Sequence, residues 1–369
     1  MQLYSPQIFN GGGEKMVQKF KLRAVVIEPK GADCNLNCSY CYHDDIKSRK
    51  TSLMSDEILE KIIATSLPSA EQVNFVWHGG EPLLAGKDFF RKIFEFQRKN
   101  IQDLSRITNG IQSNLVLVDE EWAELLSTNG VRIGVSIDGD EELHNAQRGQ
   151  YQKTIRGINL LLKAGIKKFG QIATIGKINV KFPDRVYEAL TSPEWSTGFD
   201  IHPCYPTPTH SFSPSLNDLL EFQKRVFDRW WEEDNPKIHI RLFKDVLRAY
   251  MGATPRTCSN RIEGCRPIVS IDEKGDVYPC SRYIKKEEFR IGNVLENEDG
   301  LVGLLMSERS QMIYDTIVQT PQECKDCQWF NYCGGGCSYQ RWLAGGFTKK
   351  FYACEIRKEF YKYVLGYLS

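Results

Sequence analysis

The sequence lacks an excess of charge of either sign. Its 369 residues contain 48 Lys and Arg against 47 Asp and Glu, which leaves a formal net charge of +1. A strongly basic surface is what draws a protein to nucleic acids or to anionic membranes. We therefore expect neither nucleic acid nor a membrane as a partner, so any partner must be recognised by a local site.

Long apolar runs are also missing. No stretch of eighteen apolar residues could span a bilayer, and residues 1–21 do not show the basic and then apolar order of a signal peptide. The sequence therefore predicts a cytoplasmic protein. Its hydrophobic content of 41% is still enough for a sizeable core, and its length allows one large domain and a smaller one. A disordered or fibrous protein is excluded.

Cysteine, by contrast, is abundant, with twelve residues in the chain. A reducing cytoplasm argues against a disulfide framework, so metal binding is the natural use of so many thiols. The cysteines fall into three groups and one single residue: Cys34, Cys38 and Cys41; Cys258, Cys265 and Cys280; Cys324, Cys327, Cys333, Cys337 and Cys354; and Cys204 alone. A lone cysteine is more often a small buried hydrophobe, and we expect this of Cys204.

The first group has the spacing C-x3-C-x2-C within residues 28–43. A four-iron cluster takes four thiolate ligands, so three local thiolates leave one iron open to chelate a small molecule. This loop resembles that of the radical S-adenosylmethionine (radical SAM) superfamily, in which the open iron holds the methionine end of SAM and an electron from the cluster yields a 5′-deoxyadenosyl radical. A zinc knuckle is the alternative, although zinc knuckles usually pair C-x2-C with a second, distant pair.

Strand-like apolar runs alternate with amphipathic stretches after residue 21. The strands are expected at 22–28, 73–77, 106–112, 131–137, 169–174 and 200–203, and the helices at 55–66, 88–99, 119–129, 153–164, 182–190 and 215–233. Six successive βα units predict an α/β fold with a parallel sheet, helices on its outer face and right-handed crossovers. This agrees with the partial (β/α)6 barrel, a TIM-type fold, of the radical SAM enzymes.

The same patterns divide the chain into four parts. We expect a flexible lead-in over 1–21, the radical SAM partial barrel over 22–235, a bridging helix within 236–257 and a cysteine-rich domain over 258–369. In the last part, 267–271 and 276–278 predict a hairpin that delivers Cys280 to the end of its second strand.

Ligand sites of parallel barrels lie at the carboxyl ends of the strands, and polar motifs follow the predicted strands here. His78-Gly79-Gly80-Glu81-Pro82 follows the second strand. Glycines allow close backbone approach to a ligand, and a carboxylate can accept from an ammonium group. The motif resembles the GGE motif that holds the amino group of SAM. Alone it would be as often a turn, but its place one βα unit after the cysteine loop favours the functional interpretation.

Further SAM contacts are implied by the same resemblance. The third strand ends in Gln112-Ser113-Asn114, the fourth in Ser136-Ile137-Asp138-Gly139, and His144 and Arg148 follow. Ser113, Ser136 and Arg148 match ribose and carboxylate contacts, and Tyr40 and Tyr42 match aromatic positions near the adenine. The alternatives are a turn at Asp138-Gly139, a solvated Arg148 and tyrosines that only pack the loop. His202, Cys204 and Tyr205, at the end of the sixth strand, should face the barrel mouth, where they could touch substrate.

The eight cysteines of the last part are enough for two fully ligated four-iron clusters, with two zinc sites as the alternative. Their order resembles the SPASM domain in its form with two auxiliary clusters, and the anaerobic sulfatase-maturating enzymes in particular. That resemblance assigns Cys258, Cys265, Cys280 and Cys337 to the inner cluster and Cys324, Cys327, Cys333 and Cys354 to the outer one. Spacing alone does not give this pairing. The implied cofactors are SAM and three [4Fe-4S] clusters.

One residue departs from the pattern of the sulfatase maturases. They follow the third cysteine of the inner set with an aspartate that takes a proton from the substrate, whereas here Ser281 follows Cys280. A serine without a partner is a poor general base at neutral pH. This puts the oxidation of Cys or Ser to formylglycine in doubt. His202, Tyr205 and Ser281 are the weak candidates for a catalytic residue.

Three hypotheses follow. The first is a peptide maturase that abstracts a hydrogen from a ribosomally made precursor peptide (RiPP maturation) and installs a thioether or a carbon–carbon cyclophane cross-link. The second is an anaerobic sulfatase maturase with a relocated base. The third is a non-catalytic electron-transfer or iron-sensing protein, against which the predicted SAM contacts argue. Either enzyme would need a reductant such as flavodoxin or ferredoxin.

Overall fold

The computed structural model describes residues 22–43, 51–67, 71–206, 211–261, 264–266 and 268–368. The predicted flexible lead-in, residues 1–21, lies outside the described residues, as does Pro267, the first residue of the predicted hairpin.

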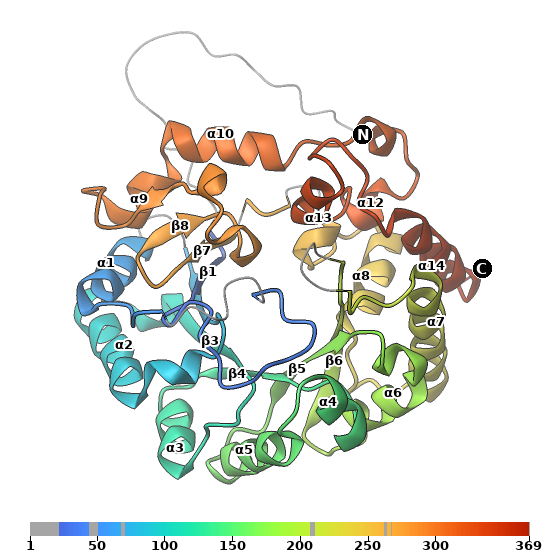
Figure 1. The fold of residues 1–369 in the computed structure, drawn as a ribbon, viewed down its shortest axis with the longest axis horizontal. Helices are drawn as coiled ribbons and strands as arrows, with labels where there is room; N and C mark the ends of the chain where they lie inside the picture. Colours follow the sequence, from blue (N-terminus) through green and yellow to red (C-terminus); the bar gives the residue numbers. More distant parts are fainter. Residues whose placement is uncertain are drawn as a thin grey trace.

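A nine-stranded open sheet organises the molecule (Figure 1). Six parallel strands lie side by side in chain order: β1 (Ala24–Ile27), β2 (Val73–Trp77), β3 (Ile107–Ser113), β4 (Arg132–Ser136), β5 (Phe169–Ile175) and β6 (Ser196–Pro203). On the other side of β1, the strand β7 (Ile268–Ile271) pairs in parallel, and β8 (Asp276–Tyr278) and β9 (Gly292–Asn293) continue antiparallel. The sheet does not close, which confirms the predicted partial barrel.

Helices cover the outer face of the six-stranded part (Figure 1). They are α1 (Asp56–Ser66), α2 (Lys87–Asn100), α3 (Glu120–Thr128), α4 (Glu141–Gln147), α5 (Tyr151–Lys163), α6 (Pro183–Thr191) and α7 (Leu216–Glu233). Side-chain caps begin α1, α3, α4 and α7; Ser55, for example, accepts from the Ile58 amide at 3.3 Å and Asp119 from the Trp122 amide at 2.8 Å. The six predicted helices therefore lie where the sequence places them, within a few residues.

The rest of the chain spans the gap between the two ends of the sheet (Figure 1). The helix α8 (Arg241–Tyr250) lies in the stretch predicted as a bridging helix and packs on β6 and on α12 (Phe330–Cys333). It is followed by α9 (Gly300–Leu305), α10 (Glu308–Ile317), α11 (Gln322–Lys325), α12 (Phe330–Cys333), α13 (Ser338–Leu343) and α14 (Cys354–Gly366). Because α9 packs on α1 and α14 packs on α7, this region is attached at both sides of the barrel.

The core lies between the strands and the outer helices. Trp77 of β2 is fully buried and meets the rings of Phe89 and Phe90 of α2 at centroid distances of 6.4 and 6.0 Å. Burying such a side chain stabilises the fold by about 1.5–3 kcal/mol. Along β1 and β2, fully buried residues alternate with half-buried ones. The half-buried face is therefore the inner face of the barrel, on which a site can be built.

Candidate active site

The cysteine loop, residues 28–43, follows β1 and lies across the centre of the partial barrel in the view of Figure 1. Cys34, Cys38 and Cys41 are partly exposed, and the Ser39 hydroxyl ties the loop to α4 by donating to the Gln147 carbonyl at 3.1 Å. Burial raises the pKa of Cys34 to about 11, so cluster binding there must displace a proton. Within the described ranges, no three His, Cys, Asp or Glu side chains are placed to hold a single metal ion.

Gly79 and Gly80 pack against this loop. Gly80 N–H donates to the Gly31 carbonyl and Glu81 N–H donates to the Asp33 carbonyl, both at 2.8 Å. A Cβ at Gly80 would lie 2.1 Å from the Asp33 oxygen, and Gly79 has a φ of +111°. The glycines therefore admit the backbone of the cysteine loop, which fixes the loop over the end of β2.

Glu81 is held rigidly between the ends of β2 and β3. Its side chain is 1% exposed and accepts from the Leu83 amide at 3.1 Å, the Ser113 hydroxyl at 2.8 Å and the Asn114 amide at 2.9 Å. Burial raises the pKa of Glu81, and these three donors act in the opposite direction. A carboxylate offers about four acceptor positions, so one remains for an outside donor.

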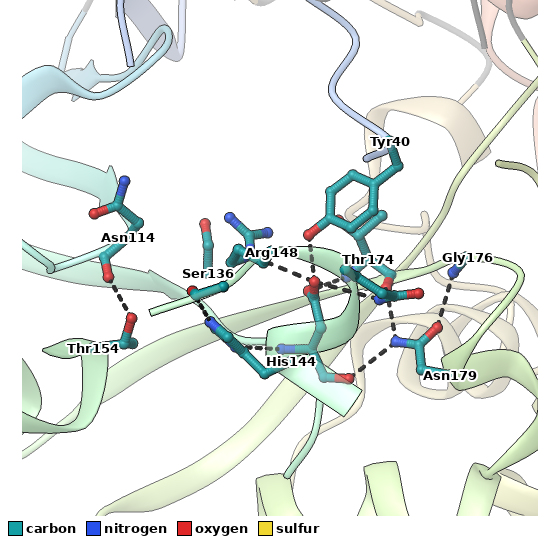
Figure 2. Close-up of polar contacts among 12 residues, drawn as sticks. Tyr40, Asn114, Ser136, His144, Arg148, Thr154, Thr174, Gly176 and Asn179 are labelled. Carbon is teal, nitrogen blue, oxygen red and sulfur yellow. Dashed lines mark hydrogen bonds and ion pairs between the residues drawn. The ribbon is translucent and has the colours of Figure 1, made fainter. Parts of the chain in front are cut away.

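Asp138, for which the sequence left a simple Asp-Gly turn open as the alternative to a ligand contact, is the centre of a buried polar network. Its carboxylate accepts from the Tyr40 hydroxyl, from the Thr174 amide at 2.9 Å and from Arg148 Nε at 3.4 Å. Figure 2 shows Tyr40, Arg148 and Thr174 converging on this point. The network joins the cysteine loop, β5 and the end of α4. No local signal separates such a residue from an ordinary Asp-Gly turn.

The candidate SAM contacts differ in their surroundings, and two of them, Arg148 and Tyr40, belong to this network. Arg148 is 11% exposed on its side chain, and its guanidinium lies over the Tyr40 ring at 5.5 Å, so it is not a solvated surface charge. Only its Nε contacts Asp138, which leaves the terminal nitrogens for an anion. Tyr42 differs from Tyr40, because it is 43% exposed and its ring packs on His43 at 4.1 Å. Ser136 Oγ accepts from Gln112 Nε2 at 2.9 Å.

The weak catalytic candidates lie apart from these groups. His202 and Tyr205 line a cavity of about 80 Å³ at the edge of β6, beside α7, α8 and α14. The Tyr205 ring meets Tyr352 edge-on at 5.4 Å and lies under the Arg282 guanidinium at 5.7 Å. Cys204 is buried, as expected. Ser281 is half-buried, and its hydroxyl lies 3.1 Å from that of Ser270.

Glu28 is the residue that sequence analysis missed. It directly follows β1, where its amide donates to the Ile271 carbonyl at 2.9 Å, and its side chain is fully buried. Neither carboxylate oxygen accepts a hydrogen bond of good geometry from any residue that the structure describes. Burial raises the pKa of Glu28 to about 8, while the neighbouring Ser281 hydroxyl acts to lower it. Its position at the carboxyl end of a predicted strand was the one feature of the sequence that could have marked Glu28 as a candidate site residue.

The cysteines of the last part gather in two sets. Cys324, Cys327, Cys333 and Cys354 line one small cavity of about 20 Å³. In the other set, burial raises the pKa of Cys280 to about 12, and the nearby Cys258 and Cys337 add to the shift. Burial also raises the pKa of Cys265, and the nearby thiols of Cys280, Cys258 and Cys337 add to that shift. Four thiolates are what a fully ligated four-iron cluster requires, so the chemistry of both sets fits such a group.

Comparison with known proteins defines the class. Residues 29–187 match the radical SAM superfamily, and residues 265–328 match SPASM, an iron–sulfur cluster-binding domain. The protein is a radical SAM enzyme with a SPASM domain, so iron–sulfur clusters replace the zinc alternatives and a non-catalytic carrier is excluded.

Two relatives define the family more narrowly. The serine-type anaerobic sulfatase-maturating enzyme of Bacteroides thetaiotaomicron is 30% identical over 387 residues, which cover 94% of this chain and 90% of the relative. The cysteine-type enzyme of Clostridium perfringens is 28% identical, over 92% of this chain and 95% of its own. The chain belongs to the family of the anaerobic sulfatase-maturating enzymes, and it acts on a peptide or protein substrate.

Solved structures agree with this assignment. The structure of anSMEcpe with bound AdoMet has a TM-score of 0.85 at 28% identity, with 94% of both chains covered. The same protein with AdoMet and the Kp18Cys peptide gives 0.83 at 28% identity, with 94% of this chain and 97% of that chain covered. Streptococcus suis SuiB bound to its precursor peptide SuiA has a TM-score of 0.67 at 16% identity, covering 91% and 76%, which is a likeness of fold alone. Among the described residues, no helix is long and apolar enough to cross a membrane.

Proposed function

We propose that this enzyme removes two hydrogens from a Cys or Ser side chain of a peptide or protein, the chemistry that forms formylglycine. The observation that carries the proposal is the likeness over nearly the whole chain to both serine-type and cysteine-type sulfatase maturases. This reverses the order of the sequence hypotheses, in which the cross-linking maturase came first. The cross-link remains the second candidate, because Ser281 stands where the sulfatase maturases have their aspartate.

The residues around the cysteine loop suit the binding of SAM. Cys34, Cys38 and Cys41 would hold a [4Fe-4S] cluster that supplies the electron for SAM cleavage. The free acceptor position of Glu81 would take the SAM ammonium, and the terminal nitrogens of Arg148 would take its carboxylate. Ser113 fixes Glu81 through a hydrogen bond, so its role is to position that carboxylate, whereas Ser136 on the inner face suits a ribose hydroxyl.

The two cysteine sets of the SPASM domain would each hold one [4Fe-4S] cluster, which gives three clusters per chain. The inner set, with Cys280, adjoins Ser281 and is the one suited to collect an electron from the substrate. The outer set lies toward α14. There it could exchange electrons with a reductant such as flavodoxin or ferredoxin. We expect the protein to act in the cytoplasm, where such reductants are found.

The proposal is tested with anaerobically reconstituted protein, SAM, a reductant and a sulfatase-derived peptide that carries Cys, Ser or Ala at one position. Formylglycine formation predicts an aldehyde that hydrazine traps, from the Cys or Ser peptide and not from the Ala peptide. Tandem mass spectrometry distinguishes the alternative, because a cross-linked product is lighter by two hydrogens and does not fragment within the ring. A cross-link in a precursor peptide, without any aldehyde product from the sulfatase peptide, would establish the second candidate.

A further inference from the structure

The bridging segment around α8 carries an excess of positive charge that the chain as a whole lacks. Residues 237–256 contain one acidic residue, Asp245, against five cations, which are Lys237, Arg241, Lys244, Arg248 and Arg256. Arg241, Lys244 and Arg248 recur at the spacing of one helix face, and Arg256 follows the helix. The positive charge is therefore gathered on one side of a single element.

Four of these cations line one cavity of about 550 Å³. Arg241 pairs there with Asp200 at 2.7 Å. Lys244, Arg248 and Arg256, by contrast, form no ion pair with any carboxylate that the structure describes. Burial lowers the pKa of Lys244, and the charge of Arg256 adds to that shift. Cations held together in this way make a local positive field, which a negatively charged partner would neutralise.

The cavity lies on the side of the barrel that does not bind substrate. Gly170 and Thr197, the second residues of β5 and β6, line it at the amino ends of these strands. The SAM contacts lie at the opposite ends, where β3 and β4 end in Ser113 and Ser136. The partner of the cavity is therefore a molecule other than SAM or the substrate peptide.

The same face adjoins a cysteine of each auxiliary set. Asp245 of α8 is 1% exposed and accepts from the Arg256 and Thr257 amides at 2.7 and 2.9 Å, which ties the turn before Cys258 to the helix. Cys258, of the inner set, is exposed. The helix α12, which ends at Cys333 of the outer set, packs on both α8 and the Cys258 turn (Figure 1). An electron could therefore leave the SPASM domain beside α8.

Two exposed apolar side chains lie at the end of α8. Met251, which lines the cavity, is 72% exposed, and the neighbouring Tyr250 is 52% exposed. Met, Tyr and Arg are enriched at protein interfaces, and complementary charges beside an apolar centre steer the association of two proteins. A small anion would make no use of Met251 or Tyr250. This composition favours a protein partner.

We propose that the face formed by Lys244, Arg248, Met251 and Arg256, which we call the carrier face, docks a small acidic protein that carries one electron. Its chemistry is that of a flavodoxin or ferredoxin. The acidic side chains of the carrier would meet the three cations, and its redox group would lie beside Cys258 and α12. This deepens the proposed function, which includes such a reductant but assigns it no docking surface.

The proposed reaction leaves one electron for such a carrier. The substrate loses one hydrogen atom to the 5′-deoxyadenosyl radical, one proton to water and one electron to the SPASM domain. That electron passes on to the docked carrier, which is reduced by one electron, and the domain returns to its oxidised state. The inference rests on the proposed two-electron oxidation but not on its product, because formylglycine and a cross-link release the same electron.

The test measures the carrier directly, without peptide or SAM. Reconstituted holoenzyme is reduced with dithionite, freed of the reductant and mixed with oxidised flavodoxin, and stopped flow gives the second-order rate constant of flavin reduction. Electrostatic steering raises association rates by about 10–10³-fold. The rate constant should therefore fall at least ~10-fold between ~0.01 M and ~1 M salt, where the Debye length shrinks from about 30 to 3 Å. This experiment needs no variant.

Charge reversal locates the docking. The combined variant Lys244→Glu, Arg248→Glu and Arg256→Glu should lower the rate constant at least ~10-fold at low salt and should match the wild type at ~1 M salt. The matched control reverses three exposed cations of α2 and α5, with the same change in net charge: Arg98→Glu, Lys153→Glu and Arg156→Glu. It should transfer electrons at the wild-type rate. Iron content is measured on every sample.

Met251→Ala tests the apolar part of the carrier face. It should raise the Kd for oxidised flavodoxin without altering the salt dependence of binding, because it removes contact area and no charge. The proposal is overturned if the charge-reversed enzyme, with full iron, reduces flavodoxin as fast as the wild type at low salt. It is also overturned if the wild-type rate constant does not depend on salt. Binding of inorganic triphosphate, with no effect of the charge reversal on flavodoxin, would assign the cavity to a small anion instead. Failure of the formylglycine assay alone would change the product and leave the carrier face in place.

Discussion

The position of Glu81 predicts how strongly SAM binding depends on one carboxylate. Glu81→Gln keeps the shape of the side chain but removes its charge and turns one acceptor into a donor. Three of the four acceptor positions serve the Leu83 amide, the Ser113 hydroxyl and the Asn114 amide, so SAM can take only the remaining one. A charge-assisted hydrogen bond there is worth about 1.5–3 kcal/mol. The Kd for SAM should therefore rise by roughly 10- to 150-fold.

The assay is anaerobic equilibrium dialysis or calorimetry of SAM against the reconstituted enzyme, with iron content measured on the same sample. Asp245→Asn is the matched control, since Asp245 is also buried and accepts three hydrogen bonds, from the Arg256 and Thr257 amides and from Asn260, but belongs to α8. It should leave the Kd unchanged. An unaltered Kd in Glu81→Gln, with full iron, would show that the Gly-Gly-Glu motif only packs the cysteine loop.

Three further predictions follow from the site. The reconstituted protein should contain about twelve irons, and replacing the three cysteines of residues 28–43 by Ala should remove roughly a third of them. A content of about four irons together with bound zinc would refute the presence of three clusters. Gly80→Ala should abolish SAM cleavage while auxiliary iron remains, because its Cβ would lie 2.1 Å from the backbone carbonyl oxygen of Asp33. Gly110→Ala is the control that should retain cleavage, because the nearest atom to its Cβ would lie 3.7 Å away. Glu28→Gln should stabilise the fold at alkaline pH: the acid's pKa rises on folding from 4.5 to about 8, so wild-type stability is lost as pH rises between these values. This shift in pKa lowers the free energy of unfolding of the wild type by roughly 4–5 kcal/mol above pH 8. The free energies of unfolding of the two proteins, measured by chemical denaturation, should converge below pH 4.5.

Much of the architecture could be read from local patterns, because the six parallel strands and their helices carry their own signals. The alternation along β2 and the caps Ser55 and Asp119 depend only on neighbours in the chain. Glu81 was found for the same reason, since its motif directly follows a strand. The partner of β7 was not predictable in this way, because nothing within a short hairpin states which distant edge it will join.

The parts of the site that sequence analysis missed are those built by distant residues. Asp138 looks like a turn residue until Tyr40, 98 positions earlier, is seen to donate to it. Glu28 looks like the polar end of a strand, and only the fold brings Ser281 and the acidic pair Asp272 and Glu273 against it. The raised pKa of Glu28 comes mainly from its burial, and these acidic neighbours add to it, so neither cause is visible in the spacing of the sequence alone.

The pairing of β7 with β1 has a consequence for the order in which the chain can mature. During synthesis β1 emerges early, but its second edge stays open until residues 268–271 have been made, more than 240 residues later. An unpaired strand edge is a template for association with other chains. A fragment that stops before β7 should therefore aggregate or require a chaperone. For the same reason the SPASM domain should fold onto a waiting partner strand, not as a separate unit added afterwards.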